Sequence, residues 1–558
     1  MEALILLGFL TGICVLAYLL GLRDQAIIQR ALDAKLKKDF GLAPNRVYKE
    51  DELDHLNGYY RSHRKDDQID DITWNDLNMD GVFARMNYCF SASGEEYLYY
   101  LLRTPGFTDD YDSFESQVEY FRNHDEERRK YQINFAKIGR KIRYSIYDYL
   151  DYLDKAEGFS NKLHFLMIGL MIIALLSCFI NFTFGFLAFI GVMLINIILY
   201  FRTKNEIEPY LVTYSYILKV IYSVRMFEKI KVPVLEEEIT KMQEAAKKFN
   251  SFLRGSSILM SPTRGNSSGN PADLLMDYVR MALHLDIIKF NQMYKEIMAN
   301  KEFLDEIITI IGKIEAEISI ACYRESVKDN FCIPQFDSNA GYEAKALIHP
   351  LVSGCVENDV NTKRGVLITG SNASGKSTYL KSCAINAILS QTIHTVLASE
   401  YRAPFFRTFS SMALQDNIFD GDSYYIVEIK SIKRILDAAK KDGAKVLCFV
   451  DEVLRGTNTV ERIAASTEIL KSFAGSDVLC FAATHDIELT SLLADKFDLA
   501  HFEGYVTDND VHFDYLIKEG PATNRNAISL LGLLGYDENI VDNAQNLADK
   551  FLATGHWE

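Results

Sequence analysis

The sequence has no excess of basic residues. Its 558 residues include 60 Lys and Arg against 76 Asp and Glu, so the formal net charge is −16. Proteins that bind DNA neutralise backbone phosphates with Lys and Arg side chains. The composition therefore gives no general argument for nucleic-acid binding and leaves only a local basic patch as a basis for it.

The sequence also lacks the cysteine and histidine spacings of metal sites. Its nine cysteines include no C-x-x-C pair, and its eleven histidines show no zinc-ligand spacing. Several of the cysteines fall within apolar runs that are typical of strands or membrane spans. We therefore expect reduced core cysteines in a cytosolic protein, not disulfide bonds.

Three long apolar runs are present. The first covers residues 1–22 and is uncharged after Glu2, and the others cover residues 163–180 and 184–201. About 20 such residues can cross a bilayer. A signal peptide is the alternative for the first run, which has no basic leading region and no small-residue cleavage site. We predict three transmembrane helices: an anchor at 1–22 and a helical hairpin at 163–201.

Basic residues on either side of the hairpin predict its orientation in the cell membrane. Lys155 and Lys162 precede the hairpin, and Arg202 and Lys204 follow it. Basic residues accumulate on the cytoplasmic side of membrane proteins. We therefore expect both hairpin ends in the cytoplasm and the N-terminus outside. The apolar runs carry no internal charge, so we interpret them as an anchor and not as an ion pathway.

A glycine-rich loop between a predicted strand and a predicted helix indicates a phosphate-binding P-loop. Residues 365–369 are apolar, residues 378–389 have helical spacing, and the loop between them fits G-x-x-x-x-G-K-S/T. Loop N–H groups and the positive helix end favour phosphates, Lys376 adds charge near the β- and γ-phosphates, and Ser377 offers a hydroxyl to Mg²⁺. The predicted nucleotide-binding residues are Gly370, Ser371, Asn372, Ala373, Ser374, Gly375, Lys376, Ser377 and Thr378.

Two further apolar runs end in polar side chains. Residues 446–450 are followed by Asp451 and Glu452, and residues 478–483 by Thr484 and His485. Ligands of parallel sheets bind at the carboxyl ends of the strands. We predict that Asp451 holds Mg²⁺, that Glu452 orients or activates the attacking water, and that His485 lies near the γ-phosphate. A satisfied buried histidine is the alternative for His485.

These segments resemble conserved runs of the MutS family of mismatch-repair ATPases. Residues 451–459 resemble D-E-x-x-R-G-T-S/T-T, and residues 483–490 resemble A-T-H-x-x-E-L-T. Residues 370–378 resemble G-P-N-M-G-G-K-S-T, with departures at the second, fourth and fifth positions. Residues 421–428 resemble G-x-S-T/S-F-x-V-E. Together with the segments near 348–351 and 515–544, the resemblance covers about residues 340 to 550.

The resemblance implies an α/β P-loop NTPase domain of the ABC/MutS type. Such a domain binds ATP and Mg²⁺ between two subunits of a homodimer and hydrolyses ATP slowly. It further implies that Asn372 and His485 sense the γ-phosphate and that Ser423 reaches the partner's nucleotide. An all-α core with long lever helices is also implied, since residues 70–105 resemble the opening of the family's helical core.

We expect five parts along the chain. They are a transmembrane anchor (1–22), a cytoplasmic helical region (23–160), a transmembrane hairpin (163–201), a helical lever region (203–335) and an ATPase domain in the cytoplasm (340–558). Residues 255–271 are rich in Ser, Gly, Asn and Pro and predict an exposed loop within the lever region.

Three functions remain open. No F-x-E wedge, the mark of the family's mismatch-reading domain, occurs in a suitable context before the helical core. The first hypothesis is a membrane-anchored ATPase that works in DNA mismatch repair or binds DNA structures. The second is a nucleotide-dependent switch for a membrane protein partner, without DNA binding. The third is an ABC transporter, which the absence of an L-S-G-G-Q signature disfavours.

Overall fold

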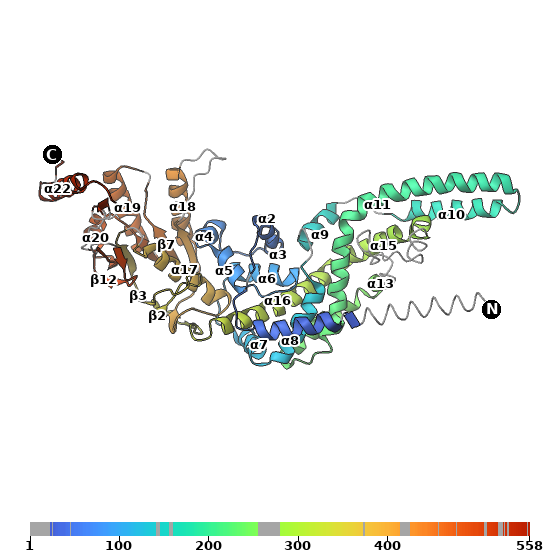
Figure 1. The fold of residues 1–558 in the computed structure, drawn as a ribbon, viewed down its shortest axis with the longest axis horizontal. Coiled ribbons are helices and arrows are strands. Elements are labelled where there is room, and N and C mark those ends of the chain that lie inside the picture. The colour runs from blue at the N-terminus through green and yellow to red at the C-terminus, as the bar shows by residue number, and fades with distance from the viewer. Residues whose placement is uncertain are drawn as a thin grey trace.

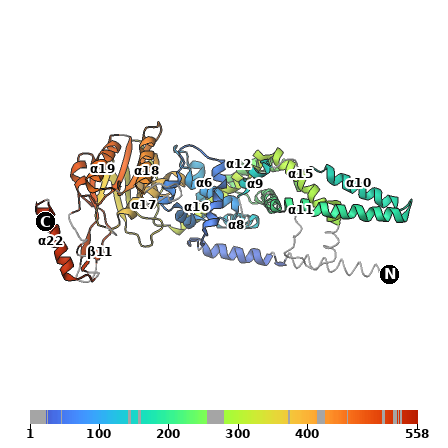
Figure 2. The same ribbon diagram turned by 90° about the horizontal axis from the view of Figure 1, so that it is seen from above.

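The molecule is elongated, with an α/β domain at one end, helices in the middle and a helical hairpin at the other end (Figures 1 and 2). The fold is taken from a computed structural model of the full chain. It describes residues 23–24, 26–44, 46–140, 145–155, 160–254, 279–371, 374–412, 424–455, 457–475, 477–506, 511–522, 528, 531–532, 535–554 and 556–557.

The α/β domain is built on a six-stranded sheet, which confirms the predicted α/β class. Its strand order is β12-β9-β4-β8-β7-β6, and every neighbouring pair is parallel except β12 with β9. The central strands are buried along almost their whole length, as parallel strands covered on both faces should be. The strands are β4 (Gly365–Thr369), β6 (Phe406–Ser411), β7 (Lys445–Asp451), β8 (Val478–Ala483), β9 (Phe497–His501) and β12 (Lys518–Glu519).

Alternate side chains of this sheet enter two separate cores, because successive residues of a strand point to opposite faces. Leu447, Phe449 and Phe481 belong to the core that includes α17, whereas Cys448 and Cys480 belong to the core with α18 and α19. The helices of this domain are α17 (Lys376–Thr392), α18 (Tyr424–Ala439), α19 (Thr459–Ala474), α20 (Glu488–Leu493) and α22 (Glu538–Thr554).

Two smaller sheets complete the domain. One has the order β1-β5-β2-β3, and the other pairs β10 with β11. The first is attached to the P-loop helix, because the Tyr342 hydroxyl donates to the Cys383 carbonyl of α17 at 2.8 Å. The strands are β1 (Gln335–Phe336), β2 (Tyr342–Leu347), β3 (Asn358–Thr362), β5 (Glu400–Ala403), β10 (Gly504–Val506) and β11 (Val511–Phe513).

The middle of the molecule is helical, as predicted, and is organised around α16. This helix of 26 residues buries most of its length against α6, α7 and α12. The elements are α2 (Glu50–Leu53), η1 (Asp54–Asn57), α3 (Gly58–Ser62), α4 (Asp71–Asp76), α5 (Met79–Met86), α6 (Ala92–Arg103), α7 (Asp112–Asn123), α8 (Asp125–Ile138), α9 (Ile146–Lys155), η2 (Pro233–Leu235), α12 (Glu236–Lys247), α13 (Asn250–Leu253), α15 (Leu285–Ala299) and α16 (Lys301–Ser326).

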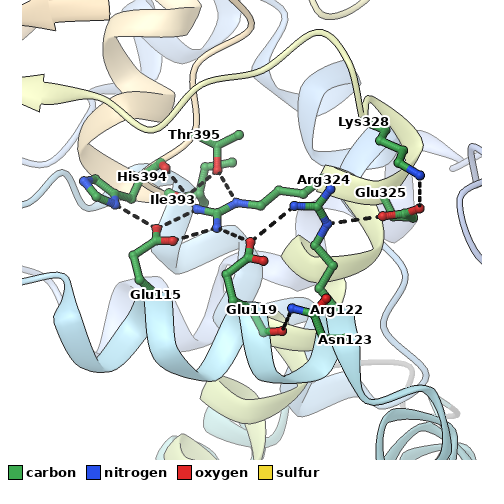
Figure 3. Close-up of polar contacts among 10 residues, drawn as sticks. All are labelled: Glu115, Glu119, Arg122, Asn123, Arg324, Glu325, Lys328, Ile393, His394 and Thr395. Atoms are coloured by element: carbon green, nitrogen blue, oxygen red, sulfur yellow. Dashed lines mark hydrogen bonds and ion pairs between the residues drawn. The ribbon is translucent and has the colours of Figure 1, made fainter.

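A buried arginine joins α16 to the α/β domain (Figure 3). Arg324, near the end of α16, is fully buried and donates to both carboxylate oxygens of Glu115 at 2.6 and 2.8 Å. It also donates to Glu119 at 3.2 Å and to the Thr395 hydroxyl at 3.0 Å. Thr395 comes three residues after the last residue of α17. A buried charge that lost these partners would be strongly destabilising, so this contact fixes how the two parts meet.

The predicted helical hairpin is present. It consists of α10 (Lys162–Ser177) and α11 (Phe182–Phe227), and the two helices pack against each other. Asn181 begins α11, because its side chain accepts a hydrogen bond from the Phe184 N–H at 3.1 Å. In both views the hairpin projects away from the rest of the molecule (Figures 1 and 2).

The prediction of three transmembrane helices is not confirmed as stated. Within the described part of the chain, one stretch, Phe182–Glu208, is long and apolar enough to cross a membrane. Helix α10 has 16 residues, which is about 24 Å of helix and falls short of a full span. The predicted anchor at 1–22 and the predicted loop at 255–271 lie outside the described residues.

Three of the glutamates buried in the helical core have strongly raised pKa values. Glu96 on α6 and Glu315 and Glu317 on α16 are each no more than 5% exposed. Burial raises the pKa of each carboxyl group from 4.5 to about 8. Glu317 is the least well compensated of the three, because neither of its carboxylate oxygens has a hydrogen-bond partner and Lys313 lies 3.7 Å away. The core therefore holds carboxyl groups that keep their proton near neutral pH.

The folded protein should lose stability as the pH rises from about 5 to 9. Folding retains a proton on Glu317 up to about pH 8, whereas the unfolded chain releases it near the ordinary pKa of 4.5. The free energy of unfolding decreases with rising pH over the range in which the folded state binds more protons than the unfolded state. We expect Glu317→Gln to raise the thermal unfolding midpoint at pH 9 and to flatten its pH dependence.

The measurement is thermal unfolding of the detergent-purified protein between pH 5.5 and 9. Glu302→Gln is the matched control, because Glu302 lies on the same helix and is exposed. A Glu317→Gln curve parallel to that of the wild type would contradict the assignment.

Candidate nucleotide-binding site

The P-loop connects β4 to α17 through two glycines in the left-handed region. Gly370 has a φ of 143° and Gly375 a φ of 107°, conformations that favour glycine over other residues. A Cβ added at Gly370 would also lie 2.7 Å from the Phe502 carbonyl oxygen. The loop therefore requires glycine at both positions. Asn372 and Ala373, which the sequence analysis includes in the site, lie outside the described residues.

Lys376 begins α17 and lies across the loop. Its Nζ donates to the carbonyl oxygens of Gly370 and Ser371, both at 2.8 Å, and the residue is 5% exposed. Burial lowers the pKa of Lys376, while Asp451 nearby favours its charged form. The positive end of α17 and the Lys376 ammonium group thus lie side by side, and both would stabilise a phosphate bound there.

Ser377 and Asp451 are brought together from different elements. The Ser377 hydroxyl, in the first turn of α17, donates to Asp451 Oδ2 at the end of β7. Hard oxygen ligands of this kind suit Mg²⁺, which keeps most of its coordination for water and phosphate oxygens. The residues therefore fit a Mg²⁺ ion bound with a nucleotide. Among the described residues, no group of three or more His, Cys, Asp and Glu forms a self-sufficient metal site.

Glu452 is held between the side chains of His485 and Arg455. His485 Nε2 lies 2.9 Å from Glu452 Oε1, and Arg455 Nε donates to Oε2. Burial alone would raise the pKa of Glu452, but the hydrogen bonds from His485 and Arg455 outweigh it and lower the pKa to about 2. A carboxylate with so low a pKa is a weak base. Glu452 is therefore better suited to orient a water molecule than to remove a proton from it.

His485 is a pocket residue and not a satisfied core histidine. Its side chain is 35% exposed, and it follows β8, the strand between β4 and β7. The Thr484 N–H donates to the Ile368 carbonyl at 2.9 Å, which ties the segment after β8 to β4. The sheet therefore brings His485 to the same cavity as the P-loop residues.

These side chains converge on one cavity of about 350 Å³. A larger cavity of about 820 Å³ lies in the helical region near His63 and has no phosphate-binding loop, so the chemistry identifies the smaller one as the site. Its lining residues are Ser374, Gly375, Lys376, Ser377, Thr378, Asp451, Glu452, Arg455, His485 and Tyr515.

Arg455 and Tyr515 also line the cavity, although neither was predicted to do so. Arg455 stands in the run that resembles D-E-x-x-R-G-T, so a motif marked it without giving it a role. Tyr515 follows β11, and its ring lies 3.2 Å from a Cβ placed on Gly375; it begins the segment 515–544 of the resemblance, which gave it no role in the site. Ser423, predicted to reach a partner's nucleotide, lies outside the described residues.

Comparisons with known proteins agree with this site. Residues 366–552 match the family model of MutS domain V. The chain is 32% identical over 278 residues to a DNA mismatch repair protein MutS of Natronomonas pharaonis, covering 47% of this chain and 31% of that protein. It is 30% identical over 275 residues to a DNA mismatch repair protein MutS of Thermotoga maritima, covering 47% and 33%.

A match of 27% identity over 269 residues to the DNA mismatch repair protein MSH3 of Yarrowia lipolytica covers 47% of this chain and 26% of that protein. The chain thus spans a third or less of the length of these curated relatives. The matched domain includes the P-loop, Asp451, Glu452 and His485. Residues 366–552 are therefore identified as a MutS domain V.

Proposed function

We propose that this chain is an ATPase that binds Mg-ATP in the cavity at the sheet edge and hydrolyses it. The observation that carries the proposal is the convergence of Lys376, Ser377, Asp451, Glu452 and His485 on one cavity. These side chains come from α17 and from the ends of β7 and β8. Phosphoryl transfer needs positioning and charge stabilisation more than covalent chemistry, and this set supplies both.

Each residue has a distinct role in the proposed reaction. Lys376 and the N-terminus of α17 bind the phosphates, and Ser377 and Asp451 hold Mg²⁺, which neutralises charge on the phosphate oxygens when bound. Glu452 orients the attacking water, and His485 lies toward the γ-phosphate. A homodimer with Ser423 at the partner's nucleotide is proposed from the resemblance of residues 421–428 alone.

We also propose that the α10–α11 hairpin is embedded in the cell membrane. In the most apolar window of Phe182–Glu208 only 11% of residues are buried. A core helix of a soluble protein would be mostly buried, and a signal sequence would lie near the N-terminus, so neither explains the hairpin. Large apolar side chains exposed along it include Phe165, Ile173, Leu187 and Ile198, at 58–69%. Exposed apolar surface of this extent favours lipid contact.

The helices provide a path by which the nucleotide could act on this hairpin. Helix α11 is continuous over 46 residues, about 69 Å, and passes from the hairpin tip into the helical core against α8 and α12. At the other end of the core, Arg324 joins α16 to the segment after α17. We propose that nucleotide-dependent movement of the α/β domain is passed along these levers.

ATP hydrolysis by the α/β domain could serve either of two functions. The relatives named above are DNA mismatch repair proteins, which favours DNA repair or binding of DNA structures. The net charge of −16 and the lipid-facing hairpin favour the second candidate, a nucleotide-dependent switch for a membrane protein partner without DNA binding.

Lys376→Ala should abolish tight nucleotide binding, because it removes the charge at the phosphate site. Glu452→Gln should bind ATP but hydrolyse it at least about 100-fold more slowly, because the water loses its orienting carboxylate. Binding of a fluorescent ATP analogue and phosphate release check both. Lys433→Ala, an exposed lysine paired with Asp437 at 3.0 Å, is the control. Normal turnover by Glu452→Gln would refute its assigned role.

The hairpin tip should be accessible from outside the cell. In a chain with Cys14 and Cys178 changed to serine, we expect Phe179→Cys to react with a membrane-impermeant maleimide in intact cells. Phe179 is 87% exposed at the tip. Asn205→Cys, which follows the apolar run at 184–201 and the basic residues Arg202 and Lys204, should react only after permeabilisation, since basic flanks favour the cytoplasm. Labelling of both only after permeabilisation would show that the hairpin does not cross the membrane.

DNA binding in a salt series separates the two downstream functions. For a DNA-processing ATPase we expect nucleotide-dependent binding to plain, mismatched or branched duplexes. That binding should weaken by about 1,000-fold or more between 50 and 200 mM salt if six or more phosphates are contacted. Protein that hydrolyses ATP but binds no duplex at low salt would instead support the membrane switch.

A further inference from the structure

The turn after β7 is conformationally strained and carries the proposed water-orienting residue. Glu452 has a φ of 60° and Leu454 a φ of 59°, a region that non-glycine residues rarely occupy. Such conformations persist only where surrounding contacts impose them. The Glu452 N–H donates to the Ala483 carbonyl of β8 at 2.9 Å, which fixes the start of the turn but not its far side.

Glu428, on α18, holds the far side of the turn. Its carboxylate accepts the N–H of Leu454 through Oε1 and the N–H of Arg455 through Oε2 at 3.0 Å. The residue is 3% exposed, and burial raises the pKa of its carboxyl group. Ser466 adds one contact, from its hydroxyl to the Val453 carbonyl at 3.1 Å. A buried carboxylate on two amides is a strong, charge-assisted arrangement.

This contact reaches the phosphate site through Arg455. The backbone of Arg455 is bound by Glu428, and its side chain donates to Glu452 Oε2. The opposite oxygen of Glu452 lies 2.9 Å from His485 Nε2. Glu428 itself does not line the cavity. Its influence on a bound nucleotide must therefore be indirect, through the position of the turn.

We propose that Glu428 is a positioning residue for ATP hydrolysis, which locks the β7 turn so that Glu452 and Arg455 face the phosphate site. The proposal rests on the proposed ATPase function. It predicts a defect in the chemical step and not in binding, because Lys376 and the N-terminus of α17 bind the phosphates without help from α18.

The first test compares turnover with nucleotide affinity in the full-length, detergent-purified protein. We expect Glu428→Gln to bind a fluorescent ATP analogue as the wild type does, and to lower kcat by about 100-fold, the effect of a misplacement of roughly 1 Å. Glu428→Gln keeps the size of the side chain but presents an N–H donor to one backbone N–H. Glu468→Gln is the matched control, since Glu468 is 74% exposed and pairs with Lys471.

The second test follows the backbone directly by hydrogen exchange and needs no hydrolysis. We expect faster exchange at Leu454 and Arg455 in Glu428→Ala, with exchange in β7 and α17 unchanged. Unchanged exchange at these two amides would contradict the claim that Glu428 binds them. Faster exchange with a wild-type kcat would overturn the positioning role. Wild-type protein that binds ATP without hydrolysing it would overturn the proposed ATPase function, before any variant is compared.

Discussion

The buried guanidinium of Arg324 is the constraint on which the arrangement of the two halves depends. A charge removed from water is tolerated only where opposite charges and hydrogen bonds replace its hydration. Here Glu115 and Glu119 supply the charges from α7, and the segment after α17 supplies further acceptors. Burial would raise the pKa of Glu115, but hydrogen bonds from Arg324 and His394 hold it below its usual value. Helices α7 and α16 and the end of the P-loop helix are therefore fixed by one set of charges.

The phosphate site uses charge in a different way. Its polar side chains are held by one another and by the backbone: Lys376 by loop carbonyls, Ser377 by Asp451, and Glu452 by Arg455 and His485. The pairs preorganise the site at the sheet edge. The low pKa of Glu452 keeps this side chain charged at any pH above about 2.

The two ends of the molecule present surfaces of opposite character. The sheet edge gathers polar groups, whereas the hairpin exposes rows of Phe, Leu and Ile side chains. One helix, α11, belongs to both the hairpin and the helical core. The hairpin and the helical core are therefore joined by one unbroken helix.

The sequence by itself determined the local features of the site. The P-loop, the Asp451–Glu452 pair and His485 were predicted because each depends on a short strand and the few residues that follow it. The sequence also predicted the hairpin, but it could not assign full spans, because the length of α10 depends on where its helix begins and ends. It also left open whether His485 lines the cavity or is buried.

Only the tertiary structure decided which distant residues meet. Arg324 pairs with a glutamate 209 positions away, and Glu428 binds amides 26 and 27 positions further along the chain. Tyr515 reaches the P-loop from beyond β11. No periodicity or motif encodes such pairs, because they arise when burial forces each polar group to find a partner across the packed elements.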